Sequence, residues 1–245
     1  MFTARKKIPA LFLLGMLLLF SHCKNSVEPG KGDYFLYDVM KKIDDLNIRY
    51  GLALPAKMQK PSPVILALHY GGQVTGTYGL DFLKLLILPA LKDLNAIIVA
   101  PNNPTGGNWY DDDSKKAVIG LLDSLKKEYN IDTTKIIITG YSLGAVGTWY
   151  YAGKYPNIFS VAVPVSGKPQ DFMISMLTDV PIYVIHSRID EVFPFEDVVK
   201  VVEQLEAKRY PVELRIVENV SHYNTEAFVR PLEGAITWIR NHWGK

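Results

Sequence analysis

The sequence has few cysteines and little net charge, and both shortages restrict what the protein can be. A single cysteine among 245 residues leaves no pair, and neither H-E-x-x-H nor C-x-x-C occurs, so we expect no bound metal and no cofactor. A formal net charge of +2 is too small to predict a nucleic-acid partner. The composition is otherwise ordinary, and the length suits one α/β domain with a large core.

A long hydrophobic run is missing as well. The apolar stretch at 8–20 has about 13 residues, whereas a membrane-spanning helix needs about 20. It follows the basic Arg5-Lys6-Lys7 and ends shortly before Cys23, an order typical of a secretion signal. The arrangement resembles a bacterial lipobox, in which Cys23 is lipidated. An ordinary cleaved signal and an uncleaved anchor helix remain the alternatives.

These features predict how the chain is divided and where it acts. We expect a signal peptide at 1–22, a polar tether at 23–33 and one α/β domain at 34–245. The predicted location is outside the inner membrane, with a lipid anchor in a membrane of a bacterial envelope. The oligomeric state is left open.

The stretch from Lys135 to Tyr151 carries the strongest local signal. Its β-branched run at 136–139 predicts a buried strand, and a helix is expected to follow the glycine-flanked motif GYSLG at 140–144. Glycine two residues away on each side permits a sharp turn that strains Ser142 and lifts its hydroxyl above the sheet. This G-x-S-x-G pattern is that of a nucleophile elbow, in which the Leu143 N–H can donate to an oxyanion.

Strands and helices alternate along the rest of the chain. We expect strands at 47–54, 64–68, 96–100, 159–165, 181–185 and 212–217, and helices at 80–94, 111–129, 195–208 and 225–243. Pro89 is expected to kink or break its helix, and 34–45 is predicted only as an amphipathic segment. The alternation predicts a mostly parallel sheet with helices on both faces. Functional residues are then expected after the carboxyl ends of strands.

A serine nucleophile needs a base, and the base needs an orienting carboxylate. His222 follows the last strand, where the base of such an architecture belongs. Of the other four histidines, His22 falls in the signal and His242 is expected at the surface, while His69 and His186 end strands and are expected to bond loop backbone.

The expected carboxylate is Asp190, in the loop after the strand at 181–185. Its neighbour Glu191 is the first alternative, with Asp171 and Glu218 behind it. The order Ser142, Asp190, His222 is that of the Ser, Asp, His triad on a sheet of this kind.

The sequence His69-Tyr70-Gly71-Gly72 is expected to supply a second oxyanion donor, because glycine after a strand lets backbone amides approach the substrate closely. The Gly71 N–H is preferred and the Tyr70 N–H comes second, and a plain glycine turn is the alternative. Trp109 and Tyr110 either form an aromatic wall for the substrate or pack their loop onto the domain. Tyr70 and Phe193 are also expected to line the cleft.

Together these motifs resemble the α/β-hydrolase family over nearly all of 47–243. The likeness is greatest to small lidless esterases, namely the phospholipase/carboxylesterase group and the feruloyl-esterase or polyhydroxybutyrate-depolymerase-like enzymes. The family's H-G-x-G motif corresponds to 69–72, with Tyr70 in place of the first glycine, and its acid loop is similar to 186–194. The resemblance implies a serine hydrolase that cleaves small-molecule or polymer carboxylic esters through an acyl-enzyme. A prolyl-oligopeptidase-like peptidase and a non-catalytic binding module are the alternatives.

Overall fold

The computed structural model describes residues 27–29, 33–72 and 75–243. Cys23, the expected signal peptide and most of the tether lie outside these residues. Within the described ranges, the helices are all too short or too polar to cross a membrane.

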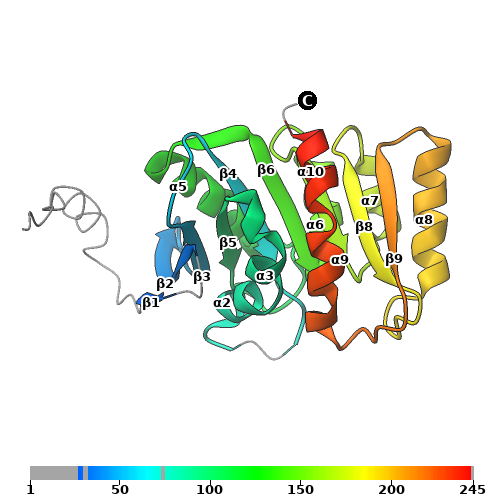
Figure 1. Cartoon of the computed structure of the whole chain (residues 1–245), viewed down its shortest axis with the longest axis horizontal. Helices are drawn as coiled ribbons and strands as arrows, with labels where there is room; N and C mark the ends of the chain where they lie inside the picture. The colour runs from blue at the N-terminus through cyan, green and yellow to red at the C-terminus, as the bar shows by residue number, and fades with distance from the viewer. Residues whose placement is uncertain (1–26, 30–32, 73–74, 244–245) are drawn as a thin grey trace, which may run out of the picture.

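One sheet runs through the described part of the chain, and its nine strands lie in the order β1-β2-β3-β5-β4-β6-β7-β8-β9 (Figure 1). The strands are β1 (Val27–Pro29), β2 (Tyr34–Ile43), β3 (Leu46–Pro55), β4 (Ser62–Leu68), β5 (Ile97–Pro101), β6 (Ile131–Tyr141), β7 (Val161–Val165), β8 (Ile182–Ser187) and β9 (Val212–Val217). The pairs from β1 through β3 to β5 are antiparallel, and all pairs from β5 to β9 are parallel. The predicted mostly parallel sheet is confirmed.

Helices cover both faces of this sheet. They are α2 (Tyr78–Phe82), α3 (Leu88–Leu91), α4 (Asp112–Lys115), α5 (Leu121–Glu128), α6 (Leu143–Lys154), α7 (Asp171–Met176), α8 (Phe195–Ala207), α9 (Val229–Glu233) and α10 (Ile236–His242). Two π-helical segments, η1 (Leu83–Ile87) and η3 (Lys116–Gly120), and two 3-10 segments, η2 (Lys92–Leu94) and η4 (Thr225–Phe228), continue or precede them. Figure 1 shows α9 and α10 in front of the sheet, with α3 packed against α9.

The two-residue period of the strands divides the core between these faces. Along β4, Leu66 packs into the cluster that includes α5, α6, α7 and α8, whereas its neighbour Ile65 packs into the cluster that includes α2, α3, α9 and α10. Both side chains are fully buried. The central strands are therefore apolar throughout, which is why they stand out in the sequence.

Three elements differ from the sequence expectation. The segment 34–45 contains β2, whose alternation is hidden because both of its faces carry buried apolar side chains and because the large apolar Phe35 and Met40 stand at exposed positions. The chain stays helical from Tyr78 to Leu94, and the turn before Pro89 widens into η1 instead of breaking. The final helix is divided into η4, α9 and α10.

Candidate active site

The elbow forms where β6 ends and α6 begins. Ser142 stands between them with φ 55° and ψ −115°, the strained conformation expected from its flanking glycines. A Cβ on Gly144 would lie 1.9 Å from the Leu68 carbonyl oxygen, and a Cβ on Gly140 would lie 2.3 Å from that of Gly144. The close approach of α6 to the end of β4 thus requires glycine here.

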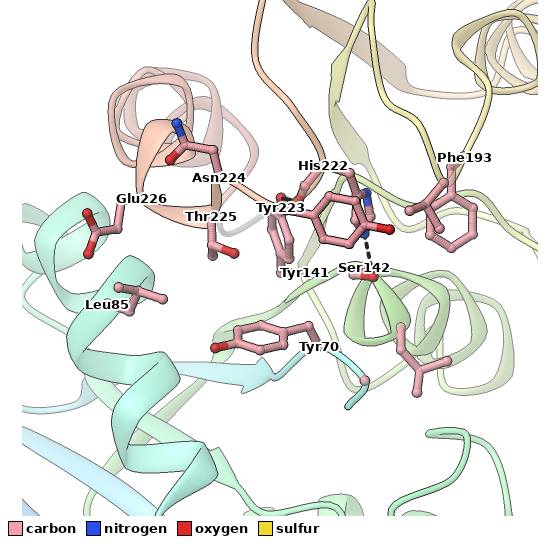
Figure 2. A pocket seen from close by; sticks show the side chains of 13 residues that line it. Tyr70, Leu85, Tyr141, Ser142, Phe193, His222, Tyr223, Asn224, Thr225 and Glu226 are labelled. Carbon is pink, nitrogen blue, oxygen red and sulfur yellow. Dashed lines mark hydrogen bonds between the residues drawn. The ribbon is translucent and has the colours of Figure 1, made fainter. Parts of the chain in front are cut away.

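A continuous line of hydrogen bonds joins three side chains from three strand ends. Ser142 Oγ donates to His222 Nε2 at 2.9 Å, and His222 Nδ1 donates to Asp190 Oδ2 at 2.9 Å (Figure 2). In the tautomer that makes both bonds, the ring proton lies on Nδ1 toward the carboxylate, and the Nε2 lone pair faces the serine. His222 and Asp190 are only 5% and 8% exposed, so water competes little for these bonds.

The Asp190 carboxylate is held by four donors. Besides His222, its Oδ2 accepts from the Ser166 hydroxyl at 2.9 Å, and its Oδ1 accepts from the N–H groups of Val192 and Phe193 at 3.0 and 2.7 Å. Burial is the largest single effect and raises the pKa of Asp190, but the bonds from His222 and the Phe193 N–H and the electrostatic effect of His222 and His186 together lower it by more, so the pKa lies below its usual range. Sequence reasoning missed Ser166, although its place directly after β7 was a usable signal.

The alternative carboxylates make other contacts. Glu191 accepts from the backbone N–H of His222 at 2.7 Å, not from the ring. Glu218 pairs with Arg188 at 3.1 Å on the exposed side of the loop, and Asp171 begins α7. Among the described carboxylates, the one hydrogen-bonded to the His222 ring is therefore Asp190.

His69 organises the end of β4 beside the elbow. Its Nδ1 donates to the Tyr70 carbonyl at 2.7 Å, and its Nε2 accepts from the Asn103 N–H at 2.9 Å. Trp109 Nε1 donates to the His69 carbonyl at 2.9 Å. Since C=O and N–H point opposite ways across a trans peptide, these bonds turn the N–H of Tyr70 away from Trp109 and that of Gly71 away from the His69 ring.

The buried His69 makes stability depend on pH. Burial lowers the pKa of His69 to about 4, against about 6.5 for an unfolded chain. Between these values the unfolded state binds a proton that the native state does not, so the free energy of unfolding falls as the pH drops from 6.5 to 4, by up to about 1.4 kcal/mol per unit. Urea unfolding at pH 7, 6 and 5 measures this, and His69→Gln should reduce the slope. An NMR titration of native His69 centred near pH 6.5 would contradict it.

A cavity of about 770 Å³ opens above Ser142. Its walls include Tyr70, Leu85, Tyr141, Phe193 and Tyr223, followed by the short polar run 224–226 at the far end (Figure 2). Gly71 and Leu143 also line it, so both expected oxyanion residues face this space.

Trp109 and Tyr110, for which an aromatic wall and packing of the loop were the two alternatives, do not line this cavity. Trp109 is fully buried beneath the site, with its ring centroid 4.9 Å from that of His69. Tyr110 packs against Tyr150 and Phe172, and its hydroxyl accepts a hydrogen bond from the Gln170 side chain. Tyr110 does not line the cavity. Both residues pack their loop onto the domain, the alternative drawn from the sequence, and Trp109 anchors the end of β4 as well.

A comparison with models of protein families identifies the family to which the chain belongs. The model of the dienelactone hydrolase family matches residues 108–234, just over half of the chain. The chain belongs to the dienelactone hydrolase family. A solved thermostable esterase superposes with a TM-score of 0.70 at 23% identity, covering 86% of this chain and 63% of that one, and the α/β-hydrolase fold expected from the sequence is confirmed.

Two curated relatives of this dienelactone hydrolase family member also match. A bifunctional acetylxylan esterase/xylanase of Neocallimastix patriciarum is 32% identical over 106 residues, which is 42% of this chain and 16% of that protein. A probable acetylxylan esterase A of Aspergillus flavus is 25% identical over 140 residues, 53% of this chain and 45% of that protein. The chain therefore spans less than half the length of either relative.

Among the described residues of this chain, no group of three His, Cys, Asp or Glu side chains could hold a metal ion.

Proposed function

We propose that this family member is a serine-dependent carboxylic ester hydrolase. The observation that carries the proposal is the unbroken chain from the Ser142 hydroxyl through His222 to Asp190, built on a strained elbow at the floor of a cavity. A serine hydroxyl is a weak nucleophile alone, and this arrangement gives it the base and the orienting anion that it needs.

In the proposed mechanism, Ser142 Oγ attacks the ester carbonyl carbon while its proton moves to His222 Nε2. The negative charge that develops on the carbonyl oxygen is held by the N–H of Leu143, at the start of α6, and by the N–H of Gly71, with Tyr70 as the alternative donor. Asp190 stabilises the imidazolium that forms.

The intermediate then collapses and releases the alcohol, which takes the proton from His222. Water next attacks the acyl-enzyme with His222 again as base. The acid leaves, and the proton returns to Ser142.

The substrate we propose is a short-chain ester of a small molecule or of a polymer. Phe193 and Tyr70 line the cavity and would contact it. The two curated relatives are named as acetylxylan esterases, which makes an acetyl group on a polysaccharide the first candidate.

A panel of p-nitrophenyl esters from acetate to laurate, with acetylated xylan and aminoacyl arylamides beside them, tests the proposal. We expect turnover to be highest with acetate and to fall along the series. Turnover of the arylamides alone would point to a peptidase and overturn the proposal.

We also propose that the protein is exported and held on a membrane through a lipidated Cys23, next to an apolar stretch of signal type. Cys23→Ser should release the protein from the membrane fraction of expressing bacteria. An unchanged membrane fraction would contradict the anchor.

A further inference from the structure

His222 is held by its backbone as well as by its ring. Its N–H donates to Glu191 Oε2 at 2.7 Å, and its carbonyl accepts from the Tyr141 hydroxyl at 2.6 Å. Proton transfer to and from Ser142 uses neither bond. Together with the ring bond to Asp190, they fix both ends of the residue and its side chain.

We propose that Tyr141 and Glu191 are positioning residues, which hold the backbone of His222 so that its ring stays within hydrogen-bonding distance of the Ser142 hydroxyl. Tyr141 directly precedes the proposed nucleophile, and Glu191 directly follows the proposed orienting carboxylate. The segments at the ends of β6 and β8 thus each supply one group of the proposed triad and, from the residue beside it, one hydrogen bond to the backbone of His222. This inference rests on the proposed esterase function.

The position of His222 explains why such bonds are needed. It lies in the irregular segment between β9, which ends at Val217, and η4, which begins at Thr225. The residue after it, Tyr223, is 78% exposed, so packing on that side does not fix the loop. A displacement of about 1 Å at a catalytic group can cost roughly 10²-fold in rate, and a loop-borne base is open to such a displacement unless its backbone is bonded.

Glu191 and Tyr141 are both in the protonation state that suits their hydrogen bonds to the His222 backbone. The hydrogen bond from the His222 N–H lowers the pKa of Glu191 below its usual range, so this side chain remains an ionised acceptor at neutral pH. Burial raises the pKa of Tyr141 to about 12, so its hydroxyl keeps the proton that it donates. Ser187 adds a further bond to the same loop, from its hydroxyl to the Val220 carbonyl at 2.5 Å.

The test compares four single variants with the wild type on p-nitrophenyl acetate. Tyr141→Phe and Glu191→Ala each remove one backbone bond, and we expect kcat to fall by about ten- to a hundredfold with KM changed less than about twofold. Glu191→Gln keeps an oxygen acceptor and should stay within about threefold of wild type. Glu218→Ala is the matched control and should leave kcat unchanged. It removes an exposed carboxylate from the segment after β9, the one that carries His222, and this carboxylate pairs with Arg188.

Two further measurements separate positioning from loss of structure. Active sites are titrated with a fluorophosphonate, so that kcat refers to folded enzyme only. A kcat per titrated site equal to wild type in both Tyr141→Phe and Glu191→Ala would overturn the inference, whatever their melting temperatures.

Hydrogen exchange of the His222 amide tests the geometry without any reaction. We expect protection in the wild type and in Glu191→Gln, and faster exchange in Glu191→Ala. Equal exchange in all three would contradict the bond to Glu191. If the three proteins exchange as expected but the wild type cleaves no ester, the proposed function is refuted and the bond to Glu191 is not.

Discussion

Replacing Ser142 with alanine is expected to lower kcat for p-nitrophenyl acetate by roughly 10⁴- to 10⁶-fold, with little change in KM. The variant keeps the cavity and the oxyanion amides, which bind the ester, but it loses the atom that forms the acyl-enzyme. His222→Ala should cost about as much, and the double variant little more, because the two groups act as one unit. Steady-state kinetics of the three variants measures this.

Ser175→Ala is the control for this prediction. Ser175 is exposed in α7, and its hydroxyl bonds only locally, to the Phe172 carbonyl at 2.8 Å. Its variant should keep wild-type activity and label fully with a fluorophosphonate, whereas Ser142→Ala should not label. Substantial turnover by Ser142→Ala would refute the mechanism.

The second large effect is expected from Gly144→Ala, although glycine has no side chain to react. The added methyl would lie 1.9 Å from the Leu68 carbonyl oxygen and 2.8 Å from that of His69. Both neighbours are backbone, so α6 or the end of β4 must move. Overpacking of this kind typically costs about 1–3 kcal/mol and sometimes more, and here the displaced strand end also carries Gly71.

We therefore expect Gly144→Ala to unfold at lower urea concentration and to lose at least about 10²-fold in kcat. Gly234→Ala serves as the control. Gly234 has helical dihedrals, and its nearest neighbour, the Pro231 carbonyl oxygen, would lie 3.2 Å from the new methyl. A Gly144→Ala variant as stable and active as Gly234→Ala would contradict the close approach described for the elbow.

The sequence made the grouping of the site residues predictable because each one follows a strand that the sequence also predicts. The carboxyl ends of parallel strands meet at one edge of the sheet, so Ser142, Asp190 and His222 could be placed near one another without coordinates. The strain at Ser142 was predictable for the same reason, since glycine at 140 and 144 has little other purpose in a strand-to-helix turn.

The contacts of the loops were not predictable in this way. Glu191 was named only as an alternative to Asp190, and its bond to the His222 N–H comes from the path of its loop, although its side chain is exposed. Trp109 follows a strand like the site residues do, and the pattern does not say whether an aromatic ring there turns up to the cavity or down to the core. In β2, apolar residues on both faces concealed the two-residue period.

Ser142 and His222, the proposed nucleophile and its base, lie 80 positions apart, and β7, β8 and β9 come between them in the order of the chain. The hydrogen-bonded arrangement therefore requires that the segment after β9 is docked against the segments that follow β6 and β8. A nascent or clipped polypeptide that has β6 but lacks this segment would hold a Ser142 hydroxyl without its hydrogen bond to His222.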